Sequence, residues 1–78
     1  MKGNLVRTIR HYKGMTQPQF SKWLGVAEST IAQVEAGHRN VSENLASKIA
    51  LKFDVTNANF IAYRERREQT SNYFLNVN

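Results

Sequence analysis

The sequence has no cysteine, one proline and four glycines in 78 residues. Without cysteine, a disulfide framework, a thiolate metal site and a thiol nucleophile are all excluded, and a reducing compartment fits this composition. No apolar run reaches the ~20 residues that a membrane-spanning helix needs. Met1 to Leu5 also lack the apolar stretch of a signal peptide. We therefore expect a cytoplasmic protein that does not bind membranes.

Residue sets that support catalysis are missing as well. The sequence offers no Ser-His-Asp arrangement, no paired carboxylates suited to a cleft and no phosphate-binding loop. His11 and His38 have no second set of metal ligands around them. The length allows one domain with a small core. We therefore predict that the protein is not an enzyme and uses no metal or cofactor.

Acidic side chains are absent from the first third of the chain. Residues 1–27 carry five basic side chains and no carboxylate, whereas residues 28–78 carry six of each sign. The formal net charge of +5 therefore arises within residues 1–27. Such asymmetry is typical of proteins that bind a polyanion, although a basic surface that faces only solvent would show the same charge.

Hydrophobic periodicity predicts four or five short helices. Thr16 and Gln19 have the spacing of a capping box at the start of the second helix, and Ser42 is a predicted cap of the fourth. Gly14, Gly25 and Gly37 stand where the first three helices would end. A fifth helix would begin near Asn57. The predicted apolar face positions are Leu5, Val6, Ile9, Tyr12, Phe20, Trp23, Leu24, Val26, Ile31, Val34, Leu45, Ala46, Ile49, Ala50, Phe53, Phe60 and Ile61.

Residues 16–37 predict two short helices that are joined by a tight turn at Gly25. Ser21 is small enough to let the second helix approach its partner closely. The third helix, from about Glu28 to Ala36, would expose short or hydrogen-bonding side chains. A helix with such a face fits the DNA major groove, where each base pair presents its own pattern of donors and acceptors.

This stretch resembles the helix-turn-helix of the Cro/C1-type (XRE) family, which includes small phage and plasmid repressors. The matching residues are Thr16, Gln17, Ser21, Leu24, Gly25, Val26, Thr30, Ile31, Val34, Glu35 and Gly37. The resemblance continues to about Ile61. It implies an all-α fold, a five-helix lambda-repressor-like domain over residues 1–62 with the helix-turn-helix at its centre.

The resemblance also implies roles for individual residues. Base edges would be contacted by Glu28, Ser29, Thr30 and Gln33. DNA phosphates would be contacted by Arg10, Gln17, Gln19, Arg39 and Asn40. Arg10 and Glu35 match a pair that forms a salt bridge in several family members, which gives Arg10 a structural alternative. Glu28 has an alternative too, because a carboxylate at this position favours the helix dipole.

Two positions depart from the family pattern. Ala27 stands where the family usually has a Ser or Thr cap before the third helix, and the loss of such a cap typically costs ~1 kcal/mol. The start of the third helix is therefore open. Asp54 stands where Gly commonly ends the fourth helix.

Residues 63–78 form a C-terminal tail. Its charged residues 64–69 could extend the fifth helix, and the apolar alternation from Tyr73 to Asn78 predicts a short strand. The tail is the candidate dimerisation element, although it could instead pack only on its own domain. The predicted contact residues are Phe60, Tyr63, Tyr73, Phe74, Leu75 and Val77.

Together these features predict a sequence-specific transcriptional regulator of double-stranded DNA. We expect a repressor that reads an inverted-repeat operator as a homodimer, with half-sites about one helical turn apart. The alternative is an antitoxin or another protein-interaction regulator of a toxin–antitoxin, phage or plasmid system, in which the tail would bind a protein partner.

Overall fold

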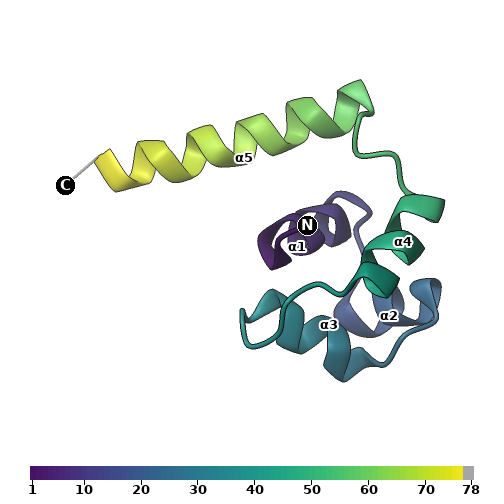
Figure 1. The fold of residues 1–78 in the computed structure, drawn as a ribbon. Coiled ribbons are helices and arrows are strands. Elements are labelled where there is room, and N and C mark those ends of the chain that lie inside the picture. The colour runs from purple at the N-terminus through teal and green to yellow at the C-terminus, as the bar shows by residue number, and fades with distance from the viewer. Residues whose placement is uncertain (77–78) are drawn as a thin grey trace.

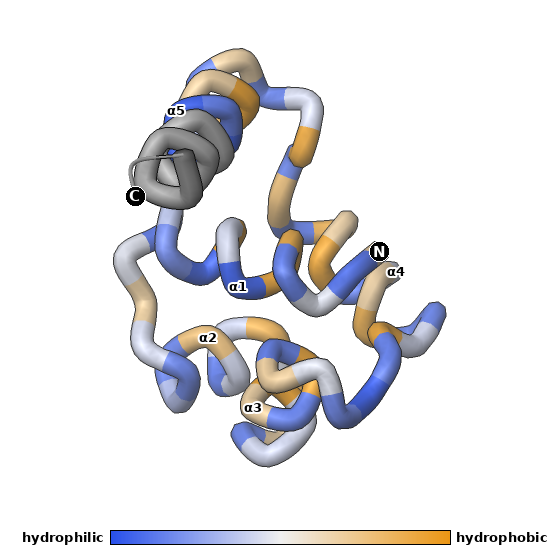
Figure 2. The backbone as a smooth tube through the Cα atoms, turned by 90° about the vertical axis from the view of Figure 1, so that its left-hand side faces the viewer, coloured by the Kyte–Doolittle hydropathy of each residue, from blue (hydrophilic) through white to orange (hydrophobic). Residues whose placement is uncertain are grey.

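The computed structural model describes the backbone of residues 1–76 and the side chains of residues 1–67. These described residues form five helices and no strand: α1 (Gly3–Tyr12), α2 (Gln17–Leu24), α3 (Glu28–Glu35), α4 (Glu43–Lys52) and α5 (Ala58–Asn76). Helix α1 lies between α5 on one side and the α2–α3 pair on the other, as Figure 1 and Figure 2 both show. The predicted all-α, five-helix architecture is confirmed.

Side-chain caps define where three of the helices begin. Gln19 Oε1 accepts from the Thr16 N–H at 2.9 Å while Thr16 Oγ1 accepts from the Gln19 N–H at 3.3 Å, which completes the predicted capping box of α2. Ser42 Oγ accepts from the Leu45 N–H at 3.1 Å, as predicted for α4. Asn57 Oδ1 caps α5 by accepting from the Phe60 N–H at 3.1 Å. These bonds satisfy N–H groups that have no partner within their own helix.

The turn between α2 and α3 depends on Gly25. Its φ of 73° and ψ of 36° lie in the left-handed region, which glycine adopts without a Cβ penalty. The Gly25 N–H donates to the Lys22 carbonyl at 3.2 Å, and the Val26 N–H donates to the Ser21 carbonyl at 3.0 Å. The chain thus leaves α2 and begins α3 only a few residues later.

One apolar core holds the helices together. Its buried members are Val6, Ile9, Phe20, Leu24, Ile31, Val34, Leu45, Ile49 and Phe60. Phe60 brings the start of α5 into this core. The Tyr12 ring meets the rings of Phe53, Phe60 and Tyr63 edge-on, with centroids 5.3 to 5.9 Å apart. This geometry is favourable for aromatic pairs and fixes the beginning of α5 against α1.

Two of the predicted apolar face positions, Ile61 and Ala50, point to the surface. Ile61 is 41% exposed, because Phe60 takes the inward position and adjacent helical residues point about 100° apart. Ala50 is exposed for the same reason beside the buried Ile49.

The short strand predicted at the end of the chain does not form over residues 73–76, because α5 continues to Asn76. Residues 58–76 contain no glycine or proline to interrupt a helix, and a lone strand has no partner to stabilise it. The helix extension is therefore the alternative that is observed, and it crosses the predicted domain boundary at residues 62–63 without a break. Val77 and Asn78 lie outside the described residues.

Within the described part of the chain, no helix is both long enough and apolar enough to cross a membrane.

A close backbone contact joins the start of α1 to the end of α3. A Cβ atom placed on Gly3 would lie 2.1 Å from the carbonyl oxygen of Val34. Such a distance is far below van der Waals contact, and the obstructing atom belongs to the backbone. Glycine at position 3 therefore lets the two helices meet.

We predict that Gly3→Ala destabilises the protein by about 1–3 kcal/mol, since the added methyl group forces α1 away from α3. In a helix this substitution usually stabilises by about 1 kcal/mol, so the sign of the change is diagnostic. Urea denaturation measures the difference. The control is Lys2→Ala, since Lys2 is exposed and its side chain makes no cap hydrogen bond. A Gly3→Ala protein as stable as wild type would contradict the contact.

Candidate nucleic-acid interface

Helix α3 has one buried and one polar face. Ile31 and Val34 are buried in the core, and Glu35 is buried at the end of the helix. Of the four residues predicted to contact base edges, Glu28, Ser29 and Gln33 are exposed and Thr30 is partly buried. The helix therefore presents hydrogen-bonding side chains outward from a fixed position.

The beginning of α3 is settled by the backbone. Ala27 is the N-cap residue with an extended conformation, and its side chain makes no cap bond. The Thr30 N–H donates to the Ala27 carbonyl at 3.1 Å. Glu28 is thus the first helical residue, where its charge is favourable to the helix dipole.

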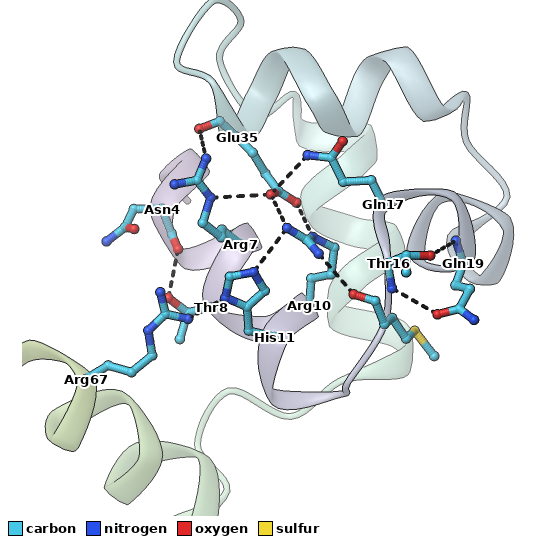
Figure 3. Close-up of polar contacts among 11 residues, drawn as sticks. Asn4, Arg7, Thr8, Arg10, His11, Thr16, Gln17, Gln19, Glu35 and Arg67 are labelled. Carbon is cyan, nitrogen blue, oxygen red and sulfur yellow. Dashed lines mark hydrogen bonds and ion pairs between the residues drawn. The ribbon is translucent and has the colours of Figure 1, made fainter.

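Glu35 is the centre of a polar network that joins α1, α2 and α3 (Figure 3). Its side chain is 1% exposed. Arg10 binds it in a bidentate manner, with Nε 2.7 Å from Oε2 and Nη2 2.8 Å from Oε1. Gln17 at the start of α2 donates from Nε2 to Oε1 at 3.4 Å. The Arg10–Glu35 pair that the resemblance implies is present, and Gln17 adds a contact between α2 and α3.

Arg7 adds two contacts to the same network. Its Nε lies 3.4 Å from Glu35 Oε1, and its Nη2 donates to the Glu35 carbonyl oxygen at 3.2 Å. The sequence interpretation missed Arg7. Its position three residues before Arg10 on one face of α1 was the available signal.

These contacts set the ionisation of the pair. Burial raises the pKa of Glu35, but the hydrogen bonds from Arg10, Gln17 and Arg7, together with the charge of Arg10, outweigh it and hold that pKa below its ordinary value. The pKa of Arg10 is raised, chiefly by its hydrogen bond to Glu35. Both groups are therefore charged at neutral pH.

The five predicted phosphate contacts divide into two groups. Arg39 and Asn40 are exposed in the loop between α3 and α4, and Gln17 lies at the start of α2. Arg10 is occupied by Glu35 and by the Met15 carbonyl at 3.0 Å, and Gln19 is occupied by the capping box. Arg10 and Gln19 thus have internal partners, as Gln17 has in Glu35, and contact with DNA phosphates stays a prediction for all five residues.

The predicted dimerisation residues are also placed differently from one another. Phe60 is fully buried within its own chain, so it is not on the surface. Tyr63 is partly buried, with its ring centroid 5.3 Å from that of Tyr12. The side chains of Tyr73, Phe74 and Leu75, and the whole of Val77, lie outside what the structure describes.

Lysines gather around the end of α2. The ammonium groups of Lys13 and Lys52 lie 5.3 and 5.4 Å from the centroid of the partly buried Trp23 indole. Lys52 also donates to the Trp23 carbonyl and Lys48 to the Gly25 carbonyl. Lys48 and Lys52 thus satisfy carbonyl oxygens at the negative end of α2, which stabilises the turn into α3.

No group of three or more potential metal-ligating side chains is found among the described residues.

Two short helices joined by a glycine turn define a helix-turn-helix domain: the second is held to α1 and α2 through the buried Glu35 and exposes a polar face. The helix-turn-helix family model of the Cro/C1 (XRE) type matches residues 6–56, and the chain belongs to this family. Its members are DNA-binding transcriptional regulators, and it is not an enzyme family. No curated protein and no solved structure gives a significant match.

We predict that Glu35→Gln destabilises the domain by about 3–5 kcal/mol, because it leaves the Arg10 side chain, which is only 12% exposed, without its counter-charge. The matched control is Glu43→Gln, which removes an exposed carboxylate from the first turn of α4. Urea denaturation at neutral pH compares the two variants. Equal stabilities of the two proteins would show that the network does not hold the helices together.

The lowered pKa of Glu35 predicts how the free energy of unfolding responds to acid. Because the folded-state pKa of Glu35 is depressed, its contribution is fully present above the unfolded-state pKa and is lost as pH falls through the folded value. Wild type and Glu43→Gln should therefore lose stability below about pH 4.5, whereas Glu35→Gln should lack this part of the acid dependence. Identical acid profiles for all three proteins would contradict the assignment.

Proposed function

We propose that the protein is a sequence-specific transcriptional repressor that reads the major groove of double-stranded DNA as a homodimer. The observation that carries the proposal is the two-faced α3, whose apolar side is buried and whose polar side is exposed. A helix fixed in this way can enter a groove without rearrangement.

The exposed side chains of α3 match the chemistry of base edges. Gln33 can bond adenine N6 and N7 together, and Glu28 can accept from cytosine N4. Ser29 can donate or accept. Gln17 would approach a phosphate from the start of α2 while its amide stays held by Glu35, and Arg39 and Asn40 would hold the backbone beyond α3.

A dimer is proposed because one recognition helix reads few base pairs. Two copies on a two-fold axis would read an inverted repeat with half-sites about one turn apart. Exposed apolar side chains support a contact near the C-terminal part of the domain: Leu51 is 86%, Val55 38% and Ile61 41% exposed. The contact would continue along the tail of α5.

A second candidate is an antitoxin or a similar regulator that binds a protein as well as DNA. The position of α5 favours it, since α5 and α3 lie on opposite sides of α1 (Figure 1, Figure 2). A protein on α5 would leave α3 free to bind DNA. Either function places the protein in the cytoplasm.

We predict that selection from a random duplex pool, at near-physiological salt, enriches an inverted repeat with half-sites about one helical turn apart. Gln33→Ala should relax the preference at one base pair per half-site and weaken binding by about 1–3 kcal/mol. Asn59→Ala, an exposed change on α5, is the control and should select the same repeat. No enrichment, with binding that vanishes as salt rises, would reject sequence reading by α3.

A truncation tests the dimer separately. We expect a chain that ends at Thr70 to be monomeric at concentrations where the full chain is dimeric, because the tail supplies part of the contact. Light scattering coupled to size-exclusion chromatography measures the mass. A truncated chain that stays dimeric at the same concentration would show that the tail is not the dimerisation element.

A further inference from the structure

His11 on α1 lies between two guanidinium groups (Figure 3). Arg67 Nη1 is 2.8 Å from His11 Nδ1, and Arg10 Nη2 is 3.2 Å from His11 Nε2. Arg67 belongs to α5 and is 56 residues away in sequence. The imidazole therefore stands at the contact between α1 and the middle of α5.

Only a neutral imidazole can hold Arg67. Arginine donates hydrogen bonds and never accepts them, while a neutral histidine has one acceptor nitrogen. Only one of the two arginines can therefore be a hydrogen-bond donor to the ring, and the shorter contact, from Arg67 at 2.8 Å against 3.2 Å from Arg10, favours Nδ1 as the acceptor. A protonated imidazole carries two N–H donors and offers no acceptor at all.

Three cations around His11 oppose its protonation: Arg7 and Arg10 on α1 and Arg67 on α5. The one carboxylate among the charged groups that act on the ring, Glu35 on α3, favours protonation. Burial, Arg10, Arg67 and Arg7 lower the pKa of His11, and Glu35 raises it without reversing the result. The Glu35 carboxylate is itself bound to Arg10 and therefore supplies little compensation at the imidazole.

We propose that His11 is an acid-sensitive switch for the docking of α5: the neutral ring holds Arg67 against α1, and protonation releases the segment from Arg64 to Arg67. The start of α5 would stay in place, since Phe60 is fully buried and the Tyr63 ring packs on Tyr12. Acid would thus loosen one segment of α5 while the domain stays folded.

The sign of the effect follows from the direction of the shift. The charge of Arg67 is one of the causes that lower the pKa of His11, after burial and Arg10, so docking opposes protonation of the ring. The docking free energy is therefore present while the ring is neutral and is lost as the pH falls and the ring becomes protonated. A consequence that rests on the proposed function is that any dimer or protein contact made through α5 becomes sensitive to pH.

The test is an NMR titration of the full-length protein from about pH 8 to about pH 5, above the range in which carboxylates titrate. We follow the His11 ring signals and the heteronuclear NOE of the Arg64–Arg67 amides. These amides should be rigid at the upper pH and lose rigidity at the midpoint of the His11 titration. None of these signals depends on DNA binding, so failure here is distinct from failure of the proposed function.

Three variants sharpen the result. His11→Asn keeps an acceptor near the Nδ1 position but cannot be protonated in this range, so the segment should stay rigid at every pH. Arg67→Met keeps the apolar stem without a donor, so the segment should be mobile throughout and the His11 midpoint should rise. His38→Gln is the control, in which the His11 ring signals and the Arg64–Arg67 amides should respond to pH as they do in wild type.

Two results would overturn the proposal. One is a pH-dependent loss of rigidity in His11→Asn equal to that of wild type. The other is a His11 midpoint that is unchanged in Arg67→Met.

Discussion

The buried carboxylate of Glu35 is the interaction on which the arrangement of the helix-turn-helix depends. A carboxylate withdrawn from water is strongly unfavourable unless it is paired and fully hydrogen-bonded. Arg10 supplies the charge and two of the bonds, and Gln17 supplies a third from α2. Since these partners come from different helices, α1 and α2 must both lie where their side chains reach the end of α3.

A steric constraint acts at the same end of α3. The missing Cβ of Gly3 lets the first turn of α1 rest on the Val34 carbonyl, one residue before Glu35. The ion pair sets which helices meet, and the glycine sets how closely they approach. Together they orient the polar face of α3 relative to α2, which is the geometry that groove reading needs.

Local features of the fold could be predicted from the sequence, because each depends on a few neighbouring residues. The capping box of Thr16 and Gln19, the Ser42 cap and the left-handed Gly25 all stand where the pattern placed them. The short strand predicted from Tyr73 onward does not form over residues 73–76 for a related reason. Alternating apolar residues carry no information about a partner strand, whereas an uninterrupted helix satisfies its own backbone.

Contacts between residues that are far apart in the sequence were harder to predict from it. The positions of Gly3, His11 and Arg67 in the sequence do not indicate that Gly3 contacts α3 or that His11 contacts Arg67. Such contacts depend on how whole helices pack. The candidate site shows the same division. The exposed residues of α3 follow from helical periodicity, and the resemblance implies the Arg10–Glu35 pair, while the contacts of Arg7 with Glu35 emerge only once the helices are packed.

Amide chemical-shift mapping on addition of a selected duplex tests most directly that α3 is the DNA-reading element. If α3 reads the DNA, the largest changes fall on residues 28–33, on Gln17 and on Arg39 and Asn40, while Arg64–Arg67 on the opposite side of α1 change little. Largest changes on Arg64–Arg67, with α3 unaffected, would contradict it and would assign nucleic-acid binding to α5.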